Sequence, residues 1–291
     1  MAGLKSRISR YFQDKLGVTA LRYQVEQQLN FQLAFLNFSA PEVLEVPAEL
    51  MLPIAGELQE KFGVNDFPSV IHKNDLMFQH HLYHHPDLAE ALRHYFRVGV
   101  SVSRELAGLF EIPVNGRLLD FGAGYGRLTR FLPSFFLNGE ILASEIKPQA
   151  VDFLKKRIGI PGIMHRAEPD SFPEEEFDGI LALSVFTHLP EELFEAWLAR
   201  LTLALRPGGK LILTWNDLAE RTGNSESRFL YTADSEDSFF RSSDRLFNEE
   251  SYGLTFVSRE YLEQLARQNA LATDFTQQGF TGNQKLAIFQ R

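Results

Sequence analysis

Short apolar runs alternate with helical apolar periodicity along the second part of the chain. The runs predict strands at residues 117–121, 140–146, 162–166, 177–183 and 211–215. The fourth run is continuous rather than alternating, as expected of a strand buried on both faces. A helix with one apolar side is predicted over residues 190–205. This order predicts an α/β fold, a doubly wound and mostly parallel sheet with helices on both faces.

The chain ends in a pattern that completes this sheet. A helix is predicted over residues 258–269, followed by strands near 272–277 and 284–290, which makes a seven-stranded sheet. Residues 216–255 precede this helix and are rich in Ser, Asp, Glu and Arg, with some Phe and Tyr. This segment is too long for a simple loop, so we predict an insert that carries function.

The first 110 residues lack this alternation of strands and helices. Helices are predicted over residues 4–38, 48–62 and 86–110, with a break at 37–47 and an irregular segment at 69–85. Pro86 suits the first turn of the third helix, because its missing N–H would be unpaired there anyway. We therefore expect residues 1–110 to form a helical cap or lid and residues 111–291 to form the α/β domain.

A glycine-rich turn follows the first predicted strand, in the stretch RLLDFGAGYGR at residues 117–127. Gly122, Gly124 and Gly126 alternate there with other residues, and a helix is expected to begin at Arg127. Glycine tolerates positive φ and has no Cβ, so a ligand can lie against the bare backbone of such a turn. The helix would add free N–H groups and the positive end of its dipole. A lone glycine loop is more often an ordinary connection, but the order of the later segments weakens that alternative.

The spacing of the glycines separates two kinds of ligand site. A dinucleotide-binding loop reads Gly-x-Gly-x-x-Gly/Ala, and counting from Gly122 its last small residue would stand at Arg127. That fingerprint fails, which disfavours a nicotinamide dehydrogenase. The pattern Asp-x-Gly-x-Gly-x-Gly that begins at Asp120 instead resembles motif I of the class I S-adenosylmethionine-dependent methyltransferases. The resemblance implies that residues 120–127 wrap the methionine half of S-adenosyl-L-methionine, with Asp120 favouring its ammonium group.

Further positions fit the same cofactor. Glu145 ends the second predicted strand, where an acid is placed to accept both ribose hydroxyls of a nucleoside. Charge-assisted bonds of this kind contribute roughly 1.5 to 3 kcal/mol each. Its neighbour Ile146 would cover one face of the adenine, and by the same resemblance Ala167 and Glu168 contact the adenine edge. Taken alone, Glu145 could equally be a solvent-exposed acid before a helix, and this alternative is at least as good as the ribose-binding role.

Two later stretches also resemble the family. Residues 177–189 show the pattern FDxIxxxxxxxHL, which is frequent there, and residues 205–213 read LRPGGKLIL. The C-terminal end of the fourth strand faces the crevice where such sheets bind ligands. The resemblance implies that Ser184 lies near the methionine part of the cofactor and His188 just beyond it. It covers about residues 109–291 and says little about the first hundred residues.

The implied reaction is a methyl transfer by in-line displacement at a carbon attached to a sulfonium. Alignment matters most, and positioning of this kind can supply roughly 7 to 11 kcal/mol of a barrier. A base is needed only for a protonated oxygen or nitrogen acceptor. His188 is the catalytic candidate, because histidine can exchange a proton near neutral pH. The alternative is that His188 only shapes the pocket wall.

Aromatic residues of both flanking regions are candidates for the acceptor site. Tyr83, Tyr95, Trp215 and Tyr252 would close over a small-molecule acceptor. As a hypothesis, the N-terminal helices and the insert form a lid that excludes water and sets the choice of acceptor. The alternative is that these side chains are core, as most aromatic residues are.

Two groups of residues are candidates for a metal site, but neither has the pattern expected of one. Four histidines are spaced to share helix faces in pairs, namely His80, His81, His84 and His85. No Asp or Glu lies between them to resemble a zinc-hydrolase motif, so a polar face or a substrate lid is preferred. Asn216 and Asp217 resemble the metal ligands of cation-dependent O-methyltransferases, but the acid that those enzymes carry after strand four is missing. No metal is therefore expected.

Composition narrows the class of partner. Apolar residues make up 44% and charged residues 23% of the chain, as in ordinary soluble globular proteins. Lys plus Arg number 29 against 38 Asp plus Glu, and the formal charge of -9 repels phosphate backbones, so no nucleic acid is expected. The absence of cysteine removes thiolate catalysis and Cys-based zinc sites. The longest apolar run is far below the roughly 20 residues of a membrane helix, so no membrane span is expected.

Together these patterns predict a cytoplasmic S-adenosylmethionine-dependent methyltransferase that acts on an oxygen or nitrogen of a small or medium-sized metabolite. One alternative is a non-catalytic binding or scaffold protein that keeps the cofactor fold. A nucleic-acid methyltransferase is the other, disfavoured by the charge and by the lack of an Asn/Asp-Pro-Pro-aromatic motif after the fourth strand. The acceptor and the oligomeric state are left open.

Overall fold

The computed structural model describes residues 42–85, 87–110, 115–137, 139–172, 176–222, 227–232, 253–276 and 284–291. The helix predicted over residues 4–38 lies outside these residues, as does Tyr252. The described chain divides into two compact units. One contains residues 42–52 and 69–95, and the other contains residues 53–68 and 96–291. The assignment of residues 1–110 as a lid stays a prediction.

The first unit contains a short two-stranded sheet and a helix. β1 (Val43–Leu44) pairs antiparallel with β2 (Ile71–His72). α4 (Leu76–His84) follows β2, so the predicted irregular segment over residues 69–85 is wrong in its second half. The physical reason is the residue directly before the helix.

Asp75 starts α4 as its N-cap. Its Oδ1 accepts the backbone N–H groups of Met77 (3.0 Å) and Phe78 (3.1 Å), and its Oδ2 accepts the hydroxyl of Tyr95 at 2.6 Å. The carboxylate is buried, and Phe78 packs edge-on against the Tyr95 ring. The cap therefore fixes both the start of α4 and its contact with the helix that carries Tyr95.

Two longer helices each belong partly to both units. α3 spans Ala48–Phe62, as predicted, and α5 spans Leu88–Ala107, within the predicted residues 86–110. A Cβ at Gly99 in α5 would lie 2.3 Å from the carbonyl oxygen of Arg127. Glycine is placed inside this helix because the helix backbone approaches the chain after the glycine turn closely.

The second unit is built on a seven-stranded sheet, which confirms the predicted fold class. Its strands are β3 (Arg117–Phe121), β4 (Glu140–Glu145), β5 (Gly162–Met164), β6 (Phe177–Ala182), β7 (Leu205–Trp215), β10 (Ala272–Thr276) and β11 (Lys285–Gln290). The order across the sheet is β10-β11-β7-β6-β3-β4-β5. β11 is antiparallel to both of its neighbours, and all pairs from β7 to β5 are parallel.

The strand order reverses next to β3. The chain passes from β3 to β4 and β5 on one side, and then returns to β6 on the other side of β3. In open α/β sheets, ligands bind outside the carboxyl ends of the strands at such a reversal. The C-terminal ends of β3, β4 and β6 are therefore where a site is expected.

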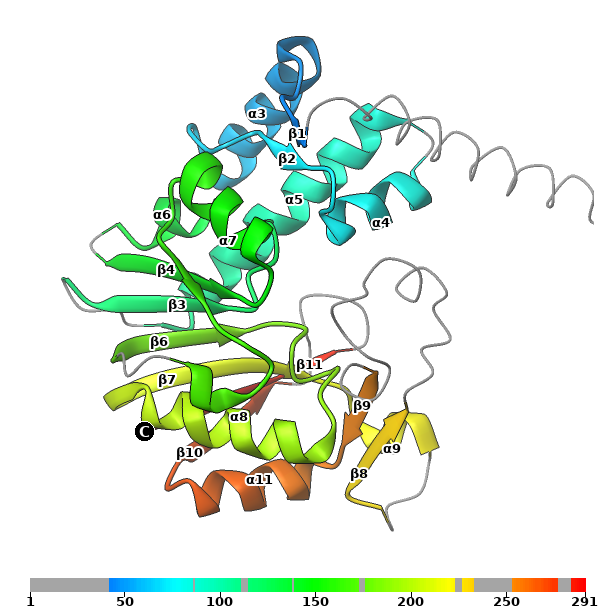
Figure 1. Cartoon of the computed structure of the whole chain (residues 1–291). Helices are drawn as coiled ribbons and strands as arrows, with labels where there is room; N and C mark the ends of the chain where they lie inside the picture. Colours follow the sequence, from blue (N-terminus) through cyan, green and yellow to red (C-terminus); the bar gives the residue numbers. More distant parts are fainter. Residues whose placement is uncertain are drawn as a thin grey trace, which may run out of the picture. The chain divides into compact units, whose positions relative to one another are not determined.

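Helices cover both faces of this sheet (Figure 1). α8 (Glu191–Leu203) and α11 (Arg259–Gln268) lie along one face, and α7 (Pro148–Phe153) lies on the other. α7 continues as a π-helix over Leu154–Ile158. Trp197 of α8 is fully buried in the apolar core on its side of the sheet. The doubly wound arrangement is thus the one predicted from the alternating pattern.

β7 begins earlier than predicted, because the LRPGG turn lies inside the strand. Leu205 pairs with Phe177 and Lys210 pairs with Gly179, so residues 206–209 form a bulge opposite a single residue of β6. The turn expected before the strand is therefore part of it.

Two strands, one near each end of the predicted insert, pair with each other. The insert begins with α9 (Leu218–Thr222), and β8 (Phe229–Thr232) pairs antiparallel with β9 (Leu254–Val257). A Cβ at Gly253 would lie 2.3 Å from the carbonyl oxygen of Thr232. The close approach of the two strands therefore requires glycine at this position.

Candidate active site

The glycine turn at the C-terminal end of β3 has left-handed backbone at each glycine. The φ angle is 72° at Gly122, 57° at Gly124 and 75° at Gly126. The helix predicted to begin at Arg127 is wrong, because successive turns continue up to α6 (Leu132–Phe135). The site therefore presents turn backbone rather than the end of a long helix. Arg127 is half-buried, and its contact with a cofactor stays a prediction.

The three glycines differ in what stands beside them. A Cβ at Gly122 would lie 2.4 Å from Cγ2 of Val185, and one at Gly126 would lie 2.9 Å from Cδ2 of Leu154. A Cβ at Gly124 would have no atom of the described chain within 4 Å, apart from those of Gly124 and its two chain neighbours. Packing therefore requires glycine at the first and third positions, whereas the space beside Gly124 is open to a ligand.

Glu145 ties the glycine turn to the end of β4. Its Oε2 accepts the N–H of Gly124 at 2.9 Å, and its Oε1 accepts the N–H groups of Ile146 (2.8 Å) and Lys147 (3.3 Å). A carboxylate offers about four acceptor positions. The predicted bonds to two ribose hydroxyls therefore require one of these N–H bonds to be shared. The roles of Glu145 and Ile146 toward the nucleoside stay predictions.

Asp120 is buried below the turn, with 4% of its surface exposed. Its Oδ2 accepts the hydroxyl of Thr129 at 2.6 Å. Burial raises the pKa of Asp120 to about 6; the bond from Thr129 opposes this increase and the charge of Glu145 adds to it. Two acids thus stand at the ends of adjacent strands, an arrangement that a positively charged ligand would stabilise. The sequence analysis did not single out Thr129.

Ser184 follows β6 and has a strained backbone. Its φ angle of 57° is uncommon for a residue other than glycine. Its N–H donates to Oγ1 of Thr214 at 2.6 Å, and its Oγ donates to Oε1 of Gln284 at 3.0 Å. Backbone strain of this kind costs about 1 to 3 kcal/mol and clusters at functional sites. Ser184 lies at the predicted edge of the sheet, and its contact with the cofactor stays a prediction.

The protonation of His188 follows from its partner. Its Nδ1 lies 2.7 Å from the carbonyl oxygen of Gly253, which can only accept, so Nδ1 carries the proton and Nε2 the lone pair. Burial lowers the pKa of His188, and the bond to Gly253 raises it in part. The imidazole is therefore neutral at neutral pH, as a base requires. The base and the pocket wall both remain open as predictions.

Hydrogen bonds join the chain around His188 to the start of β9. The N–H of Gly253 donates to the carbonyl of His188 at 3.0 Å, and the N–H of Thr255 donates to that of Thr187 at 2.8 Å. The hydroxyl of Thr255 donates to the carbonyl of Leu189 at 2.5 Å. These bonds form what we call the insert ladder, which holds His188 in place from the insert.

The predicted adenine side of the site follows β5. Nε1 of Trp197 donates to the carbonyl oxygen of Ala167 at 2.7 Å, which fixes this segment against α8. Glu168 is exposed. His165 stacks on Phe121 with ring centroids 4.8 Å apart, and burial lowers its pKa to about 4. The contacts of Ala167 and Glu168 with adenine stay predictions.

The three described aromatic candidates for acceptor binding have different surroundings. Tyr95 is fully buried in the first unit, where Tyr83 is 38% exposed. Trp215 is buried at the end of β7 and packs edge-on against Phe275. Burial gives Tyr95 and Trp215 a packing role, as the alternative interpretation expects. Contact with an acceptor stays a prediction for all four, including Tyr252.

Asp217, a metal-ligand candidate, is paired with a lysine. Nζ of Lys285 lies 2.5 Å from Oδ2 of Asp217 and 2.8 Å from Oε1 of Glu220. An ammonium group thus occupies the position beside this carboxylate. In the first unit, the rings of His80 and His84 are in contact, with centroids 4.3 Å apart. Across the described ranges, no group of three or more His, Cys, Asp or Glu side chains is arranged to hold a metal ion.

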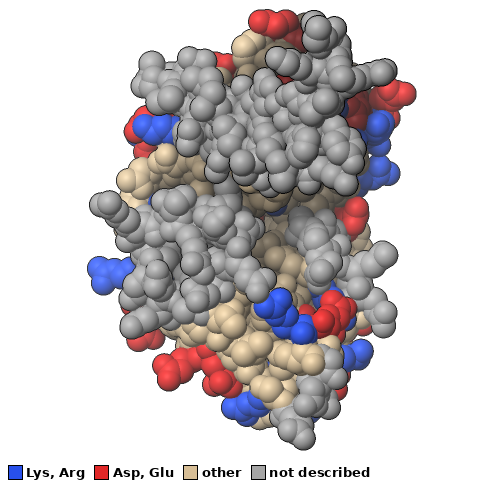
Figure 2. All heavy atoms as spheres, turned by 90° about the vertical axis from the view of Figure 1, so that its right-hand side faces the viewer, with Lys and Arg blue, Asp and Glu red and all other residues tan. Residues whose placement is uncertain are grey.

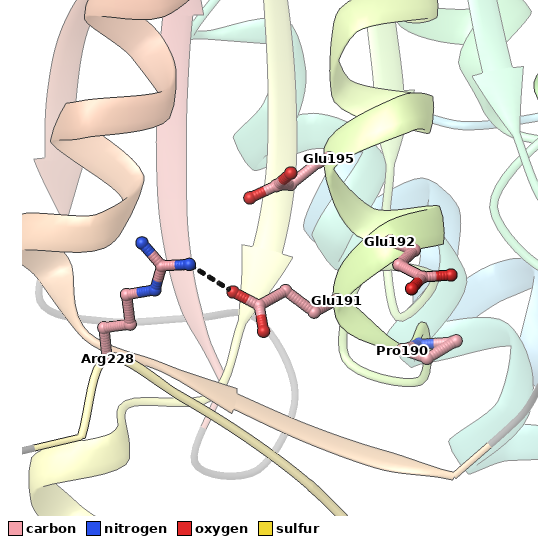
Figure 3. A pocket seen from close by; sticks show the side chains of 5 residues that line it. All are labelled: Pro190, Glu191, Glu192, Glu195 and Arg228. Carbon is pink, nitrogen blue, oxygen red and sulfur yellow. Dashed lines mark hydrogen bonds and ion pairs between the residues drawn. The ribbon is translucent and has the colours of Figure 1, made fainter.

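A shallow pocket of 340 Å³ lies at the N-terminal end of α8 (Figure 3). It is lined by Pro190, Glu191, Glu192, Glu195 and Arg228. Arg228 pairs with Glu191 at 3.0 Å, and the hydroxyl of Tyr261 donates to the carboxylates of this pocket. None of its lining residues belongs to the predicted donor site.

The described surface carries both signs of charge. Figure 2 shows Lys and Arg side chains next to Asp and Glu side chains at several places on one face. Among the described ion pairs, Arg117 Nε lies 2.9 Å from Oε2 of Glu140. Within the part of the chain that is described, no helix combines the length and the apolar character needed to cross a bilayer.

Comparison with known families gives one match. A family model described as "Methyltransferase domain" matches residues 119–211. The matched stretch begins in β3 and ends in β7, so it contains the glycine turn, Glu145 and His188. A comparison with curated proteins finds no match.

Several solved structures resemble the chain distantly. DesVI of Streptomyces venezuelae is 15% identical, with 67% of this chain and 91% of that chain covered and a TM-score of 0.48. Human N-acetylserotonin methyltransferase in complex with SAM is 16% identical, with 84% and 60% covered and a TM-score of 0.49. The 1,6-didemethyltoxoflavin-N1-methyltransferase of Burkholderia thailandensis is 16% identical, with 87% and 92% covered and a TM-score of 0.48. Similarity at this level carries no conclusion about what this chain modifies.

Proposed function

We propose that this chain is a class I S-adenosylmethionine-dependent methyltransferase that transfers the methyl group of its cofactor to an oxygen or nitrogen of a small or medium-sized metabolite. The methyltransferase assignment rests on the family match over residues 119–211, on the order of the sheet and on the glycine motif.

The open backbone at Gly124, with Glu145 and Asp120 beside it, is the observation that carries the donor site. A ligand can approach Gly124 because no atom of the described chain occupies the space of a Cβ there. The ammonium and sulfonium groups of the cofactor are cations, and they offset the repulsion between the two acids. The ribose hydroxyls have a carboxylate acceptor in Glu145. The residues present therefore fit the cofactor.

The part that the chain plays in the reaction is positioning. The cofactor, when bound, supplies a methyl group attached to a positively charged sulfur. Val185 lies against Gly122, so the end of β6 adjoins the glycine turn, and His188 follows three residues later. In the base alternative, Nε2 of His188 takes the proton of the acceptor; otherwise the neutral ring excludes water and orients the acceptor.

The charge of the chain supports a small acceptor over a nucleic acid. The formal charge is -9, and described cations such as Arg117, Arg206 and Lys285 are paired with acids. A phosphate backbone would need unpaired Lys and Arg side chains gathered on one face. A metabolite makes no such demand.

Calorimetry and a turnover screen test the proposal together. Calorimetry with S-adenosylmethionine and S-adenosylhomocysteine measures donor binding, and release of S-adenosylhomocysteine in the presence of metabolite fractions measures turnover. We expect binding that Glu145→Ala weakens, and turnover with one class of small metabolite. Binding without turnover in any fraction would favour the scaffold alternative, and turnover with DNA or RNA would favour the nucleic-acid alternative.

His188→Gln separates the two roles of His188. If the ring is a base, His188→Gln should lower turnover at neutral pH with unchanged donor affinity, and the fall in wild-type turnover on the acidic side of the pH profile should disappear. A change in the affinity for the acceptor alone is expected if the ring is part of the pocket wall.

A further inference from the structure

Thr129 contacts the acid below the glycine turn, and nothing in the sequence pattern points to it. Its hydroxyl donates to Oδ2 of Asp120 at 2.6 Å, a short distance of the kind found in charge-assisted bonds. Thr129 is fully buried and Asp120 nearly so. A carboxylate in such surroundings keeps its charge only where donors or positive groups compensate for the lost water.

The surroundings of Asp120 supply little other compensation. Its register partners on the neighbouring strands are Ala143 and Leu181, which are apolar. The charged group that faces it is Glu145 at the end of β4, which has the same sign. Within the described chain, the Thr129 hydroxyl is the side-chain donor to this carboxylate. The bond from Thr129 is therefore a large part of what favours the ionised form.

Thr129 also lies directly beneath the turn. The position of a Cβ at Gly126 is 3.6 Å from Cβ of Thr129, and the N–H of Leu132 donates to the carbonyl of Thr129 at 3.3 Å. The Thr129 backbone is thus held by the chain that follows the turn, and its side chain lies where the hydroxyl reaches Asp120. This placement orients Asp120 as well as compensating its charge.

We propose that Thr129 is a positioning residue that holds Asp120 ionised below the glycine turn, and so sets the pH range over which the site binds the ammonium end of the methyl donor. The inference rests on the proposed function, since it takes the donor to be the ligand of the turn. It predicts that replacing Thr129 weakens the binding of the amino-acid end of the donor. Binding of the nucleoside end, beside Glu145, should not change.

Two ligands, one with and one without the amino-acid tail, distinguish an effect on the tail from an effect on the nucleoside. S-adenosylhomocysteine carries the tail with its ammonium group, and methylthioadenosine keeps the nucleoside and the sulfur but lacks the tail. Their dissociation constants are measured by calorimetry from about pH 5 to pH 8 for the whole chain and for Thr129→Val, which has the same shape without the hydroxyl. Thr129→Ser, which keeps the hydroxyl, is the matched control.

We expect Thr129→Val to bind S-adenosylhomocysteine about tenfold more weakly near pH 5 and only about twofold more weakly near pH 7, because a smaller fraction of Asp120 is ionised in the variant. The pH at which this affinity is half lost should rise by about one unit, because the charged form of Asp120 has lost its donor. Binding of methylthioadenosine should be unchanged, and Thr129→Ser should behave like the wild type.

If Thr129→Val lowered the affinity for both ligands equally, the inference would be overturned, because Thr129 would then have a purely structural role. An unchanged pH profile in Thr129→Val would overturn it too. If the wild type binds neither ligand at any pH, the proposed function fails and the inference fails with it.

A double variant keeps the test decisive if Thr129→Val does not fold. Asp120→Asn with Thr129→Val has no buried charge to compensate, so it should be folded under conditions in which Thr129→Val alone is not. Failure of this variant to fold would overturn the inference, since the defect would then not depend on the charge of Asp120.

Discussion

At the scale of single residues, the proposed donor site combines two features that lower the stability of the fold. Asp120 is a buried acid next to Glu145, and Ser184 has a left-handed backbone without being glycine. Each feature costs folding free energy, and each lies at the carboxyl end of a central strand. Costs of this kind persist where they serve a ligand. Binding of a cation to the site would recover part of the cost.

Asp120→Asn should stabilise the cofactor-free protein and weaken donor binding. The pKa of Asp120 is about 6 in the folded chain against an ordinary value of 3.8, so its stabilising contribution is present at low pH and lost as the pH rises through 6. Near pH 8 the ionised acid costs up to about 3 kcal/mol, which the neutral amide avoids.

Thermal unfolding of Asp120→Asn and the wild type near pH 5 and near pH 8 measures this cost. The variant should be the more stable protein near pH 8, and its advantage should shrink near pH 5. An advantage of the same size at both pH values would contradict the buried-acid explanation.

Gly124 and Gly126 form a matched pair for separating ligand access from packing. Alanine at either position meets a left-handed backbone, which costs about 1 to 2 kcal/mol. A Cβ at Gly126 would also meet Leu154 at 2.9 Å, whereas one at Gly124 enters open space. Gly126→Ala should therefore lose more stability, and Gly124→Ala should lose more donor affinity.

Urea denaturation and calorimetry on both variants check this prediction. If Gly124→Ala binds S-adenosylhomocysteine like the wild type, the ligand does not lie against this part of the turn.

The chemistry of single positions was predictable where it is local in sequence, and not where it depends on distant residues. The motif predicts Asp120, the three glycines and Glu145 as a group, and the structure brings them to one edge of the sheet. The bond from Ser184 to Gln284 joins residues 100 positions apart, and no spacing rule points to it.

At the scale of elements, a helix or strand was predicted correctly where apolar periodicity sets its bounds. The prediction was wrong where a single residue sets them. The central strands were predicted because they are buried runs, and β3 has the bounds predicted for it. α4 was missed because an N-cap, Asp75, starts it. The helix expected at Arg127 was wrong because left-handed glycines continue into further turns. The LRPGG bulge in β7 was taken for a turn, because both conformations favour the same residues.

Asp75→Ala should destabilise the first unit by about 2 to 3 kcal/mol, because it removes two cap bonds and the acceptor of the buried Tyr95 hydroxyl. Asp87→Ala is the control. Asp87 is exposed and its Oδ1 accepts only the N–H of Glu90, at 2.8 Å, so about 1 kcal/mol is expected. Hydrogen exchange of α4 and urea denaturation measure both, and equal losses would contradict the central role of Asp75.

At the scale of the whole molecule, the alternating pattern predicts the sheet order because parallel strands need crossover helices. The reversal beside β3 follows from the return of the chain to β6, and it places the site without any knowledge of the ligand. The predicted donor residues all belong to the second unit, whereas the acceptor candidates Tyr83 and Tyr95 belong to the first. Sequence alone does not show which residues of the first unit serve an acceptor.

Hydrogen exchange with and without ligands tests the lid hypothesis. S-adenosylhomocysteine alone should protect residues 120–129 and 144–147, and it should leave α4 unchanged. Addition of an acceptor should then protect α4 if the first unit closes over it. Protection of α4 by the donor alone would mean that the first unit belongs to the donor site, and no protection with either ligand would contradict a lid.

The insert ladder has a consequence for protein engineering. Hydrogen bonds from Gly253 and Thr255 attach the C-terminal end of the insert to the chain around His188. The antiparallel pairing of β8 with β9 holds the two ends of the insert together. A different segment joined at Thr232 and Gly253 should therefore leave the register of β8 and β9 unchanged. Chimeras grafted at these anchor points should accept new substrates while their affinity for the methyl donor stays that of the parent.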